Sequence, residues 1–171
     1  STFSNRCDIY DPAINTFTQV ANLPQSKHTY AAALLGDGRV LACGGYTGSM
    51  TNRCDIYNPS TNIWTQVANL PQTKEGHAAA SLTDGRVLMC AGRTAVSTFT
   101  NRCDIYDATS NTWTQVANLP QSKHAHFSVP LQDGTILMCA GWPATNRCDL
   151  YNVGTNSWTQ VADYPSTPVY A

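Results

Sequence analysis

The sequence has 171 residues, of which 42% are hydrophobic and 12% are charged, and its formal net charge is −1. A length of this size is typical of one domain, and a near-neutral chain without a basic stripe disfavours nucleic acid as a partner. No apolar run approaches the ~18 residues of a membrane-spanning helix, so a helical membrane span is not expected.

The chain repeats one segment four times, beginning with NRCDIYDPAINTFTQVANLP at Asn5. The opening STFSNRC matches the interior stretch STFTNRC, so we expect the chain to begin partway through a repeat. The cysteine of the repeat recurs after 47, 49 and 45 residues, and an aromatic residue always follows it ten positions later. Periods of roughly 20 to 50 residues indicate a repeat architecture.

Each complete period contains four strand-like segments in a fixed order. In the first period, HTYAAALL begins at His28 and is joined to RVLACGG by Asp37-Gly38, a strong hairpin signal. RCDIY begins at Arg53 and leads through a turn to IWTQVANL at Ile63. No segment shows helical periodicity, so four short antiparallel strands in about 47 residues favour a β-propeller blade.

The segment DGRVLACGGYTGSMTNRCDIYNPSTNIWTQVANLPQ resembles a kelch repeat, especially the version found in secreted bacterial proteins and galactose-oxidase-like enzymes. The matching features are the glycines after the second strand, the Tyr-Asp/Asn-Pro turn and the tryptophan, and they cover essentially the whole chain. Only Gly44-Gly45 keeps the double glycine, since later copies read Ala91-Gly92 and Ala140-Gly141. The resemblance implies an all-β propeller of four-stranded antiparallel kelch-type blades.

We therefore predict a single kelch-repeat propeller domain or segment over residues 1–171, complete in itself or part of a longer or multi-chain array. Its expected parts are a half-blade 1–24, three complete blades 25–71, 72–120 and 121–165, and a strand stub 166–171. Kelch order places the small residues Ala31, Ala32 and Ala33 on an inner strand. An open array of this kind leaves blade faces and strand edges uncovered.

Two series of cysteines lie on the second and third strands of the expected blades. If Cys43 faces Cys54 across a hairpin, Leu41 faces Ile56 in the same register. The intervals between paired cysteines are 11, 13 and 9 residues, and their even differences preserve the side-chain alternation of a strand. We predict three disulfides: Cys43–Cys54, Cys90–Cys103 and Cys139–Cys148. Reduced core cysteines are the alternative, and zinc is disfavoured because no Cys-x-x-Cys pair occurs.

Persistent disulfides imply an oxidising compartment, so we expect an extracellular protein, secreted or at the cell surface. Cys7 is then the odd cysteine, either unpaired or joined to another chain. Its partner is expected on a second strand that this chain lacks, upstream in a longer protein or in a neighbouring molecule.

A search for catalytic chemistry finds no nucleophile elbow, His-Glu-x-x-His motif, P-loop or GxGxxG. The copper site of galactose-oxidase-like enzymes, built from tyrosines, histidines and a cross-linked cysteine, cannot be carried over. Every cysteine here lies at one of two repeated positions, on the second or the third strand of a blade, so no cysteine is set apart for a copper site. We predict no catalytic, cofactor-binding or metal-binding residues and no enzymatic activity. A fragment of a copper-radical oxidase is the alternative.

Lysines and histidines recur at the start of the expected inner strand, in SKHTY, TKEGH and SKHAH. They would approach one rim of the central channel: Lys27, His28, Lys74, His77, Lys123, His124 and His126. They could form a shared ligand or metal site, but we favour histidines that form hydrogen bonds at the strand entry, since ligands would have to converge from separate blades.

An aspartate follows each first-series cysteine, and we expect it to pair with the arginine before that cysteine or with a backbone donor. The repeated tyrosines and tryptophans are interpreted as blade packing rather than sugar platforms.

The segment between paired cysteines differs most between copies, reading GGYTGSMTNR, AGRTAVSTFTNR and AGWPATNR. Loops on a rigid scaffold commonly carry recognition, so Tyr46, Arg93, Phe99 and Trp142 are the candidate binding residues.

These patterns together predict a non-catalytic extracellular scaffold. It would bind protein or glycan through its loops, or assemble with copies of itself into a fibre or surface component. Assembly is suggested by the half-blade, the strand stub and Cys7, because a head-to-tail contact that does not close generates a filament. A closed four-bladed ring, which needs roughly twenty more residues of repeat, is the competing outcome.

Overall fold

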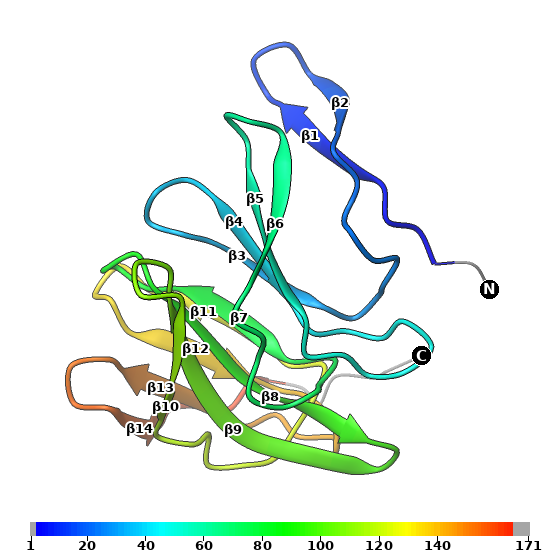
Figure 1. Cartoon of the computed structure of the whole chain (residues 1–171). Coiled ribbons are helices and arrows are strands. Elements are labelled where there is room, and N and C mark those ends of the chain that lie inside the picture. Colours follow the sequence, from blue (N-terminus) through cyan, green and yellow to red (C-terminus); the bar gives the residue numbers. More distant parts are fainter. Residues whose placement is uncertain (1–2, 166–171) are drawn as a thin grey trace.

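The computed structural model describes residues 3–165, and within them it contains fourteen β-strands and no helix. The strands form one two-stranded hairpin and three four-stranded antiparallel sheets, which follow one another in chain order (Figure 1). The sheets do not close into a ring in this part of the chain, and no helix there could cross a membrane. The expected strand stub 166–171 lies outside the described residues. The predicted all-β architecture of propeller blades is confirmed.

The strands occur in the predicted order, four to each complete blade. The half-blade pairs β1 (Cys7–Asp11) with β2 (Thr16–Val20). Blade A consists of β3 (Ala31–Leu34), β4 (Val40–Cys43), β5 (Cys54–Asn58) and β6 (Ile63–Val67). Blade B consists of β7 (Ala78–Ser81), β8 (Val87–Ala95), β9 (Thr98–Asp107) and β10 (Thr112–Val116). Blade C consists of β11 (Phe127–Pro130), β12 (Ile136–Cys139), β13 (Cys148–Asn152) and β14 (Ser157–Gln160).

The register between the second and third strands of blade A is the predicted one. Cys43 lies opposite Cys54, and Leu41 lies opposite Ile56. The equivalent residues are paired in blades B and C, and all three disulfides are present, at Cys43–Cys54, Cys90–Cys103 and Cys139–Cys148. The disulfides close loops of 11, 13 and 9 residues. Each bond lowers the entropy of the unfolded chain and so adds roughly 2.5 to 3 kcal/mol to the free energy of unfolding.

The predicted loop between the paired cysteines is wrong in blade B, where strands β8 and β9 extend beyond the disulfide. Gly92 pairs with Thr100 and Arg93 with Phe99, and the chain reverses at Val96 and Ser97. The stretch RTAVSTFT explains the difference, because threonine, valine and phenylalanine favour extended pairing over an irregular loop. Blade B therefore projects a rigid hairpin where its neighbours have loops.

The hydrophobic core lies between the blades rather than within any one of them. One face of blade A, with Leu41 and Ile56, packs against Val87, Met89 and Tyr106 of blade B. The opposite face of blade B packs in the same way on blade C, with these buried residues in contact: Leu88, Ile105, Ile136, Met138 and Tyr151. A strand places alternate side chains on opposite faces, so each sheet supplies one half of two successive cores.

A pair of hydrogen bonds clamps every blade to the one before it. In blade B, Asn111 Oδ1 accepts the N–H of Ala68 at 2.8 Å, and Trp113 Nε1 donates to the Ala68 carbonyl at 2.9 Å. Asn62 and Trp64 hold Ala21 identically, and Asn156 and Trp158 hold Ala117. The tryptophans are packing residues, as predicted, and they also satisfy a backbone carbonyl of the neighbouring blade.

The second glycine after each second strand is required by steric contact, which explains why only the first is replaced by alanine. Gly92 has φ of 110°, and a Cβ atom there would lie 2.9 Å from the Glu75 carbonyl oxygen. Ala91 has φ of 59°, in the left-handed region that an L-residue can adopt at modest cost. The kelch-type turn is thus kept in copies that lack the double glycine.

We expect Trp113→Phe to lower the free energy of unfolding by about 1 to 2 kcal/mol, because it leaves the Ala68 carbonyl without its donor while the ring still packs on Tyr106. Urea denaturation followed by circular dichroism measures the change. Trp158→Phe should give a similar loss. Two variants as stable as the parent chain would contradict the role given to the clamp.

Candidate functional site at the loop face

Each complete blade joins one rim residue to one residue of the variable loop. The pairs form by two-way backbone hydrogen bonding: His28 with Tyr46, Glu75 with Arg93, and His124 with Trp142. The rim and loop candidates therefore belong to one surface, which we call the loop face. It comprises the variable segments 44–53, 91–102 and 140–147 and the rim residues paired to them.

A pocket of about 430 Å³ opens on the loop face between blades B and C. Phe99 stacks on the His124 ring, with ring centroids 4.9 Å apart and planes 17° from parallel. The Trp142 side chain is 46% exposed. The complete lining is Arg93, Val96, Ser97, Phe99, His124 and Trp142. The structure thus brings together three of the four loop candidates and one rim histidine.

Arg93 is held rigidly at the pocket wall by a buried carboxylate. Its Nε donates to Glu75 Oε1 at 2.8 Å, and its Nη2 also binds this oxygen. The other oxygen of Glu75 accepts a hydrogen bond from Thr29 Oγ1 at 2.9 Å, so a residue of blade A fixes the same carboxylate. About a third of the Arg93 side chain, 37%, remains exposed to solvent.

Tyr46 does not line this pocket. It lies at the equivalent position of blade A, where its ring centroid is 5.4 Å from that of His28. Phe3 contacts both rings, with its ring centroid 4.6 Å from that of His28 and 6.2 Å from that of Tyr46. The loop face therefore presents one aromatic pair in blade A, one between blades B and C, and the Glu75–Arg93 ion pair in blade B.

The three lysines predicted at the channel rim are buried and lie near the buried His77 and His126. Lys27, Lys74 and Lys123 are at most 3% exposed, and their Nζ atoms have no hydrogen-bond partner among the described residues. Lys74 Nζ approaches Asp104 Oδ2 at 4.0 Å, and Asp104 accepts hydrogen bonds from Arg102. The predicted Arg–Asp pairing is present in all four copies, at Arg6–Asp8, Arg53–Asp55, Arg102–Asp104 and Arg147–Asp149.

The prediction that histidines form hydrogen bonds at the strand entry is only partly right. His28 Nδ1 lies 3.2 Å from Thr29 Oγ1, and His124 Nδ1 lies 3.2 Å from the Trp142 carbonyl. His77 and His126 are buried instead, and neither ring nitrogen has a partner within residues 3–165. Burial lowers the pKa of His126 to about 3 and that of His77 well below its usual value, so both rings are neutral at physiological pH.

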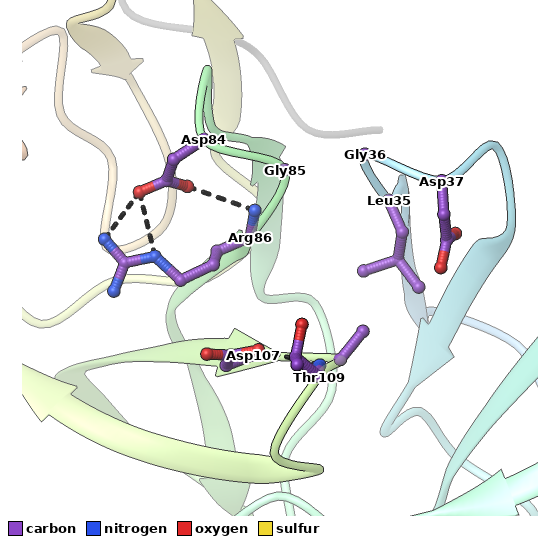
Figure 2. Close-up of a pocket in the computed structure, with 9 residues that line it drawn as sticks. Leu35, Gly36, Asp37, Asp84, Gly85, Arg86, Asp107 and Thr109 are labelled. Carbon is purple, nitrogen blue, oxygen red and sulfur yellow. Dashed lines mark hydrogen bonds and ion pairs between the residues drawn. The ribbon is translucent and has the colours of Figure 1, made fainter.

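A second pocket of about 360 Å³ lies at the opposite end of the blades, between the β3–β4 and β7–β8 turns (Figure 2). Figure 2 shows Asp84 paired with Arg86, and Asp37 pairs with Arg39 in the same way. These carboxylates are neutralised within their own turns. No group of three or more His, Cys, Asp or Glu side chains placed to hold a metal ion occurs within residues 3–165.

Sequence reasoning missed Glu75 as a partner of Arg93. A signal was present, because Glu75 replaces the histidine of the other copies at the rim. In the same copy Arg93 replaces an aromatic residue of the loop. Two linked charge changes within one repeat indicate an ion pair. The contribution of Val96 and Ser97 carried no comparable signal, because it depends on the hairpin extension of blade B.

Comparison with known proteins gives one family match. A family model described as the Kelch motif matches residues 28–71 and 76–120, a little over half of the chain. These two segments cover most of blades A and B. No curated protein matches the sequence.

The buried lysines give a pH dependence with a definite sign. Burial lowers the pKa of Lys74 to about 8 from an ordinary value of 10.5, although Asp104 opposes the shift. Between these values the unfolded chain binds more protons, so the free energy of unfolding should rise between pH 8 and pH 10, by up to about 3 kcal/mol. Burial also raises the pKa of Tyr106 and Tyr151, which limits the rise above pH 10.

Lys74→Met should reduce this rise, leaving the part due to Lys27 and Lys123, whose pKa values burial also lowers. Urea denaturation at a series of pH values measures both chains. The three lysines of the chain all occupy this repeat position, so an arginine serves as the control. Arg6→Met removes a charge that interacts with Asp8 in the half-blade, and it should leave the slope between pH 8 and pH 10 unchanged. A slope that is the same in Lys74→Met and the parent would contradict the assignment.

Proposed function

The chain belongs to the kelch-repeat family, and from this premise we propose that it is a non-catalytic extracellular scaffold that binds a protein partner through its loop face. Kelch repeats form propellers that are typically interaction domains without catalytic activity. The proposal assigns that general role to the loop face of this molecule and places the protein outside the cell.

The observation that carries the proposal is the pocket between blades B and C. It combines a fixed guanidinium, from Arg93, with the stacked rings of Phe99 and His124 and the exposed indole of Trp142. Arginine and large aromatic residues dominate the binding energy of protein interfaces. Arg93 loses little conformational freedom on binding, because Glu75 already holds it in place.

The extracellular location is supported by the three disulfides. Such bonds persist in oxidising environments and are rare in the cytosol. The six cysteines are at most 4% exposed, and the Cys43–Cys54 and Cys90–Cys103 bonds lie between blades, so reducing agents reach those two bonds only after the blades separate. The disulfides therefore suit a protein that must keep its loop face intact outside the cell.

A glycan is the second candidate ligand of the same pocket. The observation that favours it is the exposure of Trp142 beside Ser97 and Arg93, since an indole face packs on a sugar ring while polar neighbours bind its hydroxyl groups. A glycan array and a protein-capture experiment with the same chain distinguish the two candidates.

We expect Phe99→Ala with Trp142→Ala to reduce binding of an extracellular protein partner at least tenfold, because both anchors of the pocket are removed. The measurement captures proteins from extracellular fluid on the immobilised chain and determines their affinities by surface plasmon resonance. Ile63→Ala is the control, since Ile63 is also an exposed apolar residue but does not line the pocket, and it should change affinity by less than about threefold. Equal binding by the double variant and the parent would refute the assignment of the site.

Cys7 is proposed to form a disulfide with a cysteine outside the three complete blades, in a longer protein or in a neighbouring molecule. Its Sγ lies 3.7 Å from the Asn5 carbonyl, and the bonded Cys54 and Cys103 lie at the same distance from Asn52 and Asn101. The half-blade thus holds its free cysteine in the orientation of the bonded ones.

Non-reducing peptide mapping of the protein isolated from its natural source tests the oxidising compartment and the fate of Cys7 together. The expected result is three links within blades and a fourth that involves Cys7. Free thiols at Cys43, Cys90 and Cys139 would rule out an oxidising compartment. A free thiol at Cys7 alone would leave the compartment intact and refute only the proposed bond.

A further inference from the structure

The clamp between blades is repeated three times, and among residues 3–165 its two outermost halves have no partner. Ala162 occupies the position of Ala21, Ala68 and Ala117, and within residues 3–165 neither its N–H nor its carbonyl forms a hydrogen bond. At the other end, the half-blade carries Asn15 in the same left-handed conformation as the clamping asparagines, with φ of 53°. One chain therefore holds both halves of the interface.

The side chains around these two half-clamps are exposed and apolar. Phe17 of the half-blade is 72% exposed and contacts Tyr10, with 5.0 Å between ring centroids. On blade C, the outer face carries exposed Phe127 and Val129 beside the buried Cys139–Cys148 disulfide. We call these surfaces the head face and the tail face. Apolar surfaces of this kind are stabilised by removal from water.

We propose that the head face of one molecule docks on the tail face of a second copy of this chain, and that the contact reproduces the clamp between blades. Asn15 Oδ1 accepts the N–H of Ala162, as Asn62 Oδ1 accepts that of Ala21 while also accepting from Tyr57. This inference rests on the proposed scaffold function and adds a specific partner to it. The contact joins unlike surfaces, so it propagates from copy to copy.

The size of the tail-face residues supports a half-blade as the occupant. At the two inner-strand positions that face the next blade, blade B has Ala78 and Ala80, which leaves room for a full blade with inner strands. Blade C has Phe127 and Val129 at those positions. Their larger side chains fill the volume that inner strands occupy elsewhere. The head face fits this shape, because within residues 3–165 the half-blade has only its two outer strands.

Phe17 sets the strength of the contact. The equivalent residue in blades A, B and C is a tryptophan whose Nε1 donates to the clamped alanine. Phenylalanine has no such donor, so the contact between copies keeps one of the two hydrogen bonds and is weaker than the interfaces within the chain. The association is therefore reversible.

The test measures self-association of the 171-residue chain by sedimentation velocity over a wide concentration range. All proteins carry Cys7→Ser, so that no covalent dimer forms. Phe17→Trp restores the missing donor and should tighten association about threefold to tenfold, the worth of one hydrogen bond. Phe17→Ala on the head face and Val129→Asp on the tail face should each weaken association at least tenfold. Ile63→Ala, an exposed apolar residue on a blade covered on both sides, should leave it unchanged.

Three results would overturn the proposal. The chain could remain monomeric at every concentration, or it could associate equally in all variants. Phe17→Trp could also raise the unfolding temperature of a species that stays monomeric, which would show that the two faces meet within one chain. None of these results depends on Phe99 or Trp142, so failure here is distinguishable from failure of the loop-face proposal.

Discussion

The alternation of side chains along each strand is the constraint on which the rest of this structure depends. On one face of every blade the second and third strands carry leucine, the disulfide and an isoleucine or leucine. On the other face they carry an aliphatic residue and the tyrosine that packs on tryptophan. Because the two faces differ, blades stack in one direction only, and each core is completed by the next copy. Neither the disulfides nor the backbone clamps could form in a register shifted by one residue.

The alternation also explains how much of the fold could be predicted. Strand order, register and the partner of each bonded cysteine follow from spacing and parity, which are properties of the sequence itself. The clamp could not be predicted, because Asn111 and Trp113 bind the backbone of Ala68, and a backbone partner leaves no trace in residue identity. The extended hairpin of blade B was missed for a related reason, since the same residue types occur in strands and in loops.

The residues of the candidate site likewise divide into those that the sequence predicts and those that it does not. Arg93, Phe99 and Trp142 were found because they vary where the rest of the repeat is constant. The burial of His77 was not foreseen, because it depends on Gly44 of the preceding blade, whose missing side chain makes room for the imidazole. Contacts within one blade can therefore largely be predicted from the repeated sequence, whereas contacts between blades become known only from the three-dimensional structure. The buried lysines are an exception, because each lies beside an aspartate of its own blade, Asp55, Asp104 or Asp149.

The disulfide at the base of each variable segment fixes the strand register below that segment. Strand pairing resumes in register below the bond whether the intervening stretch forms a short loop or a long hairpin. New sequence can therefore be inserted above the bond, in steps of two residues, while the blade below remains unchanged. The molecule has the properties of a display framework. The binding surface of each blade can change in sequence independently of the others, because the fold of the blade below it is kept.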